Sequence, residues 1–317
     1  MRDERDTSPA LSGLEAAAPV TVWSPGQTAA ARALGVSAVL AGVAYIAWRV
    51  GFTIDWSAWW IAVPFVALAD LTVHYQRFGD GDPLLMISGS GGDLRQTFPD
   101  QHPLNRDFDT VHYDQRGLGQ TTLGDHPPTM ADFADDAARL CEALGWSQCR
   151  VVGTSFGGMV AQHLAIRHPQ LVERLVLNCT SPGGDLASYP LDTIYDLPDD
   201  EAAELRLRLT DTRYATEGTL PGLDALVPMY RQPVAPSPGF RAQLAARADH
   251  DTTADLSSIQ APTLVCAGRF DGIAPLVNSE RLAELIPGAE LDVFEGGHLF
   301  MFQDRRSRER TREFLLG

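Results

Sequence analysis

The segment Gly153-Thr154-Ser155-Phe156-Gly157 places a serine between two glycines in the pattern G-x-S-x-G. Residues 150–153 are predicted to form a strand before it, and residues 156–168 a helix after it. A serine on such a sharp turn exposes its hydroxyl at the carboxyl edge of a sheet, with glycines where side chains would collide. We interpret Ser155 as a nucleophile; the alternative is a serine that only caps the following helix.

A serine hydroxyl is a weak nucleophile until a base accepts its proton. His298 follows a predicted strand at residues 291–294 on a glycine loop, so it is the histidine best placed to be that base. The base needs a carboxylate to fix its tautomer, and Asp271 follows the predicted strand at residues 263–267. Asp271 could instead only form a turn, and Asp185 is the reserve candidate. The order serine, aspartate, histidine is the one that accompanies a nucleophile on a strand-to-helix turn.

Two backbone N–H groups are needed to stabilise the oxyanion of a tetrahedral intermediate. Phe156, directly after the serine, would supply one of them. The other is expected from the glycine-rich loop at residues 88–92, with Ser90 as the donor. Such a loop could also cradle a phosphate, but the chain has no lysine and no G-x-G-x-x-G at the required spacing.

Composition narrows the class of protein. The 317 residues are 44% hydrophobic and 21% charged, which suits one large α/β domain or two smaller ones. The formal charge of −16 disfavours binding to nucleic-acid phosphates. All 25 basic residues are arginine, which excludes a pyridoxal-phosphate Schiff base, a Walker A loop, a protein kinase and an S-x-x-K acylase. We expect the four cysteines to be reduced and buried; they are Cys141, Cys149, Cys179 and Cys266.

The elements that must position these residues alternate between strand and helix from residue 71 onward. This alternation predicts a mostly parallel sheet covered by helices on both faces. We expect residues 71–180 and 255–317 to form this α/β core. Residues 181–254 would be a small helical cap with proline-rich breaks, and several of its tyrosines and leucines could line an apolar pocket.

The N-terminal region has a different composition. Residues 1–28 are polar and are expected to be a disordered tail. Residues 29–70 contain two uncharged runs, at 33–48 and 56–69, flanked by tryptophans. This pattern indicates a hydrophobic helical hairpin, either membrane-associated through residues 33–69 or packed on protein. No secretory signal is recognisable, and we expect a cytoplasmic location.

From about residue 72 onward the chain resembles the α/β-hydrolase fold superfamily. The segments that carry the resemblance are residues 88–92, 113–119, 153–158, 268–275 and 297–298. Members usually have His-Gly where this chain has Ser88-Gly89, so the support of that loop differs here. Asp114 and Arg116 match a turn-forming motif of the family, and the resemblance implies an ion pair between them beside the site.

These residues predict a serine hydrolase that cleaves a carboxylic ester of a small or medium apolar substrate through an acyl-enzyme. We expect neither cofactor nor metal, and no oligomeric state is predicted. The alternatives are an aminopeptidase similar to proline iminopeptidases, which share the run Asp114-Gln115-Arg116-Gly117, or a non-catalytic ligand-binding member of the fold. A lactonase, a perhydrolase or a carbon–carbon hydrolase would carry the same three side chains.

Overall fold

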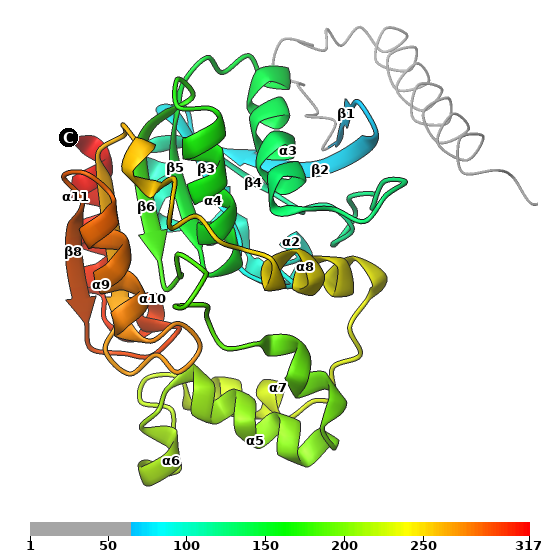
Figure 1. Ribbon diagram of the computed structural model, residues 1–317, viewed down its shortest axis with the longest axis vertical. Helices are drawn as coiled ribbons and strands as arrows, with labels where there is room; N and C mark the ends of the chain where they lie inside the picture. Colours follow the sequence, from blue (N-terminus) through cyan, green and yellow to red (C-terminus); the bar gives the residue numbers. More distant parts are fainter. Residues whose placement is uncertain (1–64) are drawn as a thin grey trace, which may run out of the picture. The chain divides into compact units, whose positions relative to one another are not determined.

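The computed structural model describes residues 65–317, which contain an eight-stranded sheet (Figure 1). The strands follow the order β1-β2-β4-β3-β5-β6-β7-β8 across the sheet. Their bounds are β1 Phe65–Leu68, β2 Leu71–Phe78, β3 Asp82–Ile87, β4 Phe108–Tyr113, β5 Cys149–Thr154, β6 Val172–Asn178, β7 Thr263–Gly268 and β8 Glu290–Phe294.

Most of the sheet is parallel. Strands β1, β2 and β4 pair antiparallel in turn, and every pairing from β4 through β3 to β8 is parallel. The carboxyl ends of β3, β5, β7 and β8 therefore lie at one edge of the sheet. In α/β sheets of this kind, ligands bind outside that edge.

Helices pack on both faces of the sheet, as the alternating pattern predicted. On one face α3 (Met130–Ala143), α4 (Phe156–Arg167) and α9 (Leu276–Leu285) contribute to a large apolar core. On the other face α10 (Phe300–Gln303) and α11 (Arg306–Leu316) contribute Phe300, Phe314 and Leu315 to a second core. In Figure 1, α3 and α4 lie side by side, and α11 lies beyond them near β8.

Local sequence signals set the ends of these helices. Thr129 begins α3 with a capping box, because its hydroxyl accepts from the backbone N–H of Asp132 while the Asp132 carboxylate accepts from the N–H of Thr129. After α3, Gly145 has a φ of +78°, a conformation that L side chains rarely adopt. Helix α3 therefore ends directly before this glycine, with Leu144 as its C-cap.

The region between β6 and β7 forms the cap. In Figure 1, α5, α6 and α7 form a group below the sheet, on the side toward which β6 runs, and α8 lies between this group and the sheet. The elements of this region are η4 (Leu191–Asp196), α5 (Asp199–Thr210), α6 (Tyr214–Glu217), η5 (Asp224–Leu226), α7 (Val227–Tyr230), α8 (Pro238–Ala248) and η6 (Leu256–Ser258). The short elements α2 (Leu94–Thr97), η2 (Pro99–Gln101) and η3 (Pro103–Arg106) connect β3 to β4.

The boundary predicted at residue 71 needs a correction. Residues 65–68, which the sequence placed at the end of an apolar helical run, form strand β1 and pair antiparallel with β2. Four apolar residues are equally typical of a short strand and of a helical end, and pairing with β2 decides between them. The tail and the remainder of the hydrophobic segment, residues 1–64, lie outside the described residues. Their membrane association stays a prediction; within residues 65–317, no helix combines the length and apolarity that a bilayer crossing requires.

All four cysteines are buried and free, as predicted. The Sγ atoms of Cys141 and Cys149 are 3.8 Å apart, and both side chains pack in the larger core. The contact with Cys141, together with burial, raises the pKa of the Cys149 thiol well above its ordinary value. These thiols act as small apolar side chains in the core.

Candidate functional site

Ser155 occupies a strained turn between β5 and α4. Its φ of 54° and ψ of −116° lie outside the regions that non-glycine residues favour. The neighbouring glycines permit this turn: a Cβ on Gly153 would lie 2.4 Å from the carbonyl oxygen of Gly157, and one on Gly157 would lie 2.1 Å from the carbonyl oxygen of Ile87. The Ser155 side chain makes no capping hydrogen bond to α4, so the helix-cap interpretation does not account for it.

Backbone and side-chain contacts hold the turn in place. The Ser155 N–H donates to the carbonyl oxygen of Asn178 at 2.9 Å, and the Thr180 hydroxyl donates to the Ser155 carbonyl at 2.8 Å. A Cβ on Gly158 would lie 2.6 Å from the Thr180 side chain, so the helix start packs closely against the end of β6. These contacts together hold the backbone of Ser155 in its strained conformation.

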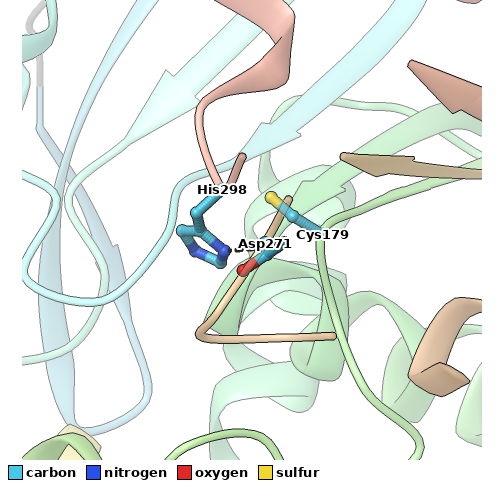
Figure 2. A group of neighbouring side chains, drawn as sticks. All are labelled: Cys179, Asp271 and His298. Atoms are coloured by element: carbon cyan, nitrogen blue, oxygen red, sulfur yellow. Dashed lines mark hydrogen bonds and ion pairs between the residues drawn. The ribbon is translucent and has the colours of Figure 1, made fainter. Parts of the chain in front are cut away.

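Ser155, His298 and Asp271 meet at the carboxyl edge of the sheet. The Nε2 atom of His298 lies 3.0 Å from the Ser155 hydroxyl, and its Nδ1 atom lies 2.8 Å from Oδ2 of Asp271. Figure 2 shows the His298 ring facing the Asp271 carboxylate across the ends of two loops. The carboxylate fixes Nδ1 as the protonated nitrogen, which leaves Nε2 free to accept the serine proton.

Asp271 has two functions at once, because its two oxygens have different partners. Oδ1 accepts the backbone N–H groups of Ile273 and Ala274 at 2.8 and 2.9 Å and so forms the turn after β7. Oδ2 contacts His298, and the residue is 5% exposed. The reserve candidate, Asp185, is exposed on a cap loop, and the structure does not bring it to His298.

The loop that carries His298 is tied to the cap. The His298 N–H donates to the carbonyl of Thr210 at 2.6 Å, at the end of α5. The Gly297 N–H donates to the side-chain oxygen of Gln303, whose amide in turn donates to Asp211 and to the Pro221 carbonyl, each at 2.8 Å. A movement of the cap would therefore move the imidazole.

The two backbone groups predicted for the oxyanion are available. Within residues 65–317, the N–H groups of Ser90 and Phe156 have no protein acceptor. A Cβ on Gly89 would lie 3.5 Å from Cβ of Ser155, so the loop after β3 passes directly over the serine. Ser90 also lines the cavity that contains the serine hydroxyl.

Two glutamines position this loop, and sequence reasoning missed both. The Gln115 amide donates to the Ser88 carbonyl at 2.7 Å and lies 3.2 Å from the Ser88 hydroxyl. The Gln243 side chain, on α8 of the cap, accepts the Gly91 N–H at 2.8 Å. Gln115 supplies the support that the missing family histidine put in question. Gln115 lies between Asp114 and Arg116 in the turn-forming motif, which is the sequence signal for its role. The motif was interpreted only through its two charged side chains.

The ion pair that the resemblance implied between Asp114 and Arg116 is absent from the described chain. Asp114 is fully buried and contacts His74 Nδ1 at 2.7 Å. Arg116 instead makes a two-point contact with Asp136 and binds Asp70 at 2.8 Å. A tight turn closes over Asp114: Gly119 has a φ of +51°, and the Gln120 N–H donates to the Asp114 carboxylate. This turn directs the side chains of Asp114 and Arg116 to different partners.

Cys179 lies beside this group in Figure 2, and its Sγ, a carboxylate oxygen of Asp271 and a ring nitrogen of His298 lie within 4.8 Å of one another. Such a trio could hold a metal only if the sulfur were a thiolate. Burial, and the charge of Asp271, raise the Cys179 pKa well above its ordinary value. The thiol therefore stays protonated, and the carboxylate and imidazole remain hydrogen-bonded to each other.

A cavity of about 680 Å³ opens onto Ser155 and His298. Its walls come from the loop after β3, from the cap and from α10 and α11. Most lining side chains are apolar, and one is acidic, Glu309 on α11. Of the cap tyrosines and leucines suggested by the sequence, Tyr195 and Tyr230 line it, whereas Leu223 packs inside the cap.

Comparison with known proteins agrees with this geometry. The family model described as alpha/beta hydrolase fold matches residues 82–304. This chain belongs to the α/β-hydrolase family. The poly(3-hydroxyalkanoate) depolymerase of Ectopseudomonas oleovorans is 30% identical over 226 residues, which cover 69% of this chain and 78% of that protein.

Solved structures extend the likeness of this α/β hydrolase to other enzymes. A hydrolase from Pseudomonas aeruginosa PA01 is 30% identical, with a TM-score of 0.63 over 80% of this chain and 97% of the other. Est816, described as an N-acyl homoserine lactone degrading enzyme, is 27% identical, with a TM-score of 0.64 over 79% of this chain and 100% of the other. The fold class predicted from the sequence is confirmed, and the chain is related to enzymes named as hydrolases.

Proposed function

We propose that this α/β hydrolase cleaves a carboxylic ester through an acyl-enzyme on Ser155. The observation that carries the proposal is the position of His298, whose ring joins the Ser155 hydroxyl at 3.0 Å to the Asp271 carboxylate at 2.8 Å. A nucleophile, a base and a group that orients the base are the three parts that acyl transfer to serine requires.

In the proposed reaction, the Ser155 oxygen attacks the ester carbonyl carbon as Nε2 of His298 takes its proton. The N–H groups of Ser90 and Phe156 donate to the resulting oxyanion, and the Asp271 carboxylate stabilises the imidazolium. His298 then protonates the departing alkoxide as the carbon–oxygen bond breaks. A water molecule, deprotonated by His298, then attacks the acyl carbon. The bond between that carbon and the Ser155 oxygen breaks, the carboxylic acid leaves, and His298 returns the proton to the serine oxygen.

The composition of the cavity favours an ester over an N-terminal peptide. An aminopeptidase must bind a positively charged amine close to the serine, and burying such a charge without an acidic partner is costly. The cavity's acidic lining residue is Glu309, which belongs to α11 rather than to the loops around Ser155. Poly(3-hydroxyalkanoates) and homoserine lactones both contain a carboxylic ester bond, which agrees with this choice.

The proposal is tested by covalent labelling together with turnover. A fluorophosphonate should label the purified protein at Ser155, and short-chain p-nitrophenyl esters should be hydrolysed. Ser155→Ala should abolish both, whereas Ser90→Ala should retain turnover because its backbone N–H is unchanged. A folded wild-type protein that neither reacts with the probe nor turns over esters would establish a binding protein instead. Faster cleavage of proline naphthylamide than of esters would establish an aminopeptidase.

A further inference from the structure

The cavity continues from Ser155 along the second face of the sheet. The register pairs Met86 of β3 with His112 of β4 on one side and with Val152 of β5 on the other. Met86, His112 and Val152 all line the cavity and form a row across three strands. Because neighbouring strands are about 4.8 Å apart and residues rise about 3.3 Å along a strand, the backbone of His112 lies roughly 14 Å from that of Ser155.

A second histidine lies against the first at this far end. His102, between η2 and η3, has its ring centroid 5.5 Å from that of His112, with the rings at 62°. Both residues line the cavity. Leu104 of η3 adds an apolar wall there, α11 adds the charged side chains Arg308, Glu309 and Arg312, and Phe300 also lines the cavity. We call the space beside His102 and His112 the histidine chamber.

The two imidazoles are unusual because no hydrogen bond within residues 65–317 uses them. Nδ1 of His102 and Nε2 of His112 are buried and have no partner. A buried polar atom without a partner costs free energy, so each such atom in a folded protein needs an explanation. No hydrogen bond in the described chain fixes the orientation of either ring, and rotation about the Cβ–Cγ bond can turn a nitrogen toward the chamber.

The electrostatic environment keeps both rings uncharged. Burial, together with the positive charge of Arg308, lowers the pKa of His102 to about 4, and burial beside His102 lowers that of His112 to about 3. A neutral imidazole has one N–H donor and one acceptor. Each ring can therefore form a hydrogen bond with a ketone or hydroxyl oxygen of a ligand.

We propose that the histidine chamber binds a carbonyl or hydroxyl oxygen in the acyl chain of the substrate, and that the preferred substrate is an ester of a medium-chain oxo or hydroxy acid. This inference rests on the proposed function for the position of the ester bond at Ser155. The roughly 14 Å between the two backbone positions separates the polar group from the ester by a medium-length chain. The apolar wall between them, formed in part by Met86 and Val152, matches that chain.

The test measures binding without turnover, so that it does not depend on the chemistry at the serine. In the Ser155→Ala protein, isothermal titration would compare p-nitrophenyl decanoate with its 4-oxo, 6-oxo and 8-oxo derivatives. We expect one derivative to bind about fivefold more tightly than the parent ester, the gain typical of one neutral hydrogen bond. Adding His112→Phe or His102→Phe should remove that preference, and His112→Gln, which keeps a donor and an acceptor, should retain it.

His126→Phe is the matched control, because the His126 side chain is 54% exposed and lies outside the cavity lining. It should leave the preference unchanged. Equal binding of the parent and all three derivatives would overturn the inference, as would a preference that survives both phenylalanine substitutions. If wild-type protein fails to hydrolyse esters while the binding preference persists, the proposed function fails and the chamber stands. Ester turnover with no oxygen preference would instead support the proposed function and overturn the chamber.

Discussion

Residues 65–317 contain two buried aspartate–histidine pairs with nearly the same geometry. Asp271 and His298 are joined at 2.8 Å, and Asp114 and His74 at 2.7 Å. Each aspartate also accepts two backbone N–H groups, from Ile273 and Ala274 or from Leu94 and Gln120. The pairs differ at the second ring nitrogen.

In one pair Nε2 faces the hydroxyl of Ser155, on a strained turn that opens to the cavity. In the other, Nε2 of His74 lies 3.1 Å from the side-chain nitrogen of Gln120 and the ring packs against Phe65. A buried aspartate–histidine contact therefore does not by itself indicate catalysis. The strained serine beside it is what gives the first pair a chemical role under the proposed function.

Replacing each aspartate by asparagine tests whether the two pairs differ in function. Asp271→Asn should lower kcat for ester hydrolysis about 10⁴-fold, because an asparagine amide favours the wrong imidazole tautomer. Steady-state kinetics with a p-nitrophenyl ester measures the effect. Asp114→Asn is the matched substitution, and the kcat of its folded fraction should stay within a few-fold of wild type. Similar losses of kcat in the two variants would contradict the distinction.

The structural pair should instead affect stability. His74→Phe would leave the fully buried Asp114 carboxylate without its imidazole partner. We expect the free energy of unfolding to fall by about 3 kcal/mol, as when one partner of a buried pair is removed. Urea unfolding followed by circular dichroism measures it, with exposed His126→Phe as the control. An unchanged urea midpoint would show that the His74 contact contributes little.

Much of the site could be predicted because its signals are local. Glycines around Ser155 and His298, and a strand before each of the three side chains, place Ser155, Asp271 and His298 at one sheet edge in any parallel arrangement. The partners of Asp114 and Arg116 could not be predicted this way, because His74, Asp136 and Asp70 come from distant segments. Strand β1 was missed for the same reason, since its pairing with β2 is a tertiary contact.

A second comparison separates histidines with a carboxylate partner from those without one. His163 and His250 contact each other at 3.2 Å, and burial lowers the pKa of each to about 4. The unfolded chain binds their protons below about pH 6.5, whereas the folded chain does so only near pH 4. The free energy of unfolding should therefore fall with decreasing pH between about 6.5 and 4, by up to about 1.4 kcal/mol per pH unit for each group.

Urea unfolding at pH 7, 6 and 5 measures this slope. His163→Gln removes one of the two titrating groups and should make the slope shallower, whereas His126→Gln should not change it. His102 and His112 contribute with the same sign, so some slope should remain in the variant. A stability that rises as the pH falls through this window would show that these rings are protonated in the folded protein.

The smallest expected effect concerns the loop that supplies the Ser90 N–H. Gln115 holds this loop through the Ser88 carbonyl, at the position where other members of the family carry a histidine before the glycine. Gln115→Ala should lower kcat/KM about tenfold, because a looser loop holds the Ser90 N–H less firmly against the oxyanion of the transition state. Binding of the ester in its ground state should change little. The loss should appear in kcat with little change in KM, since the contact is made mainly in the transition state.

Exposed Gln260→Ala is the control for this change and should behave as wild type. Gln115→Glu sharpens the test further, since a carboxylate cannot donate to the Ser88 carbonyl and the two oxygens would repel each other. Its kcat should be at least as low as that of Gln115→Ala. A Gln115→Ala variant with unchanged kcat would mean that the Gln243 contact to Gly91 is sufficient to hold the loop, and that the cap, rather than the turn after β4, fixes the oxyanion donor.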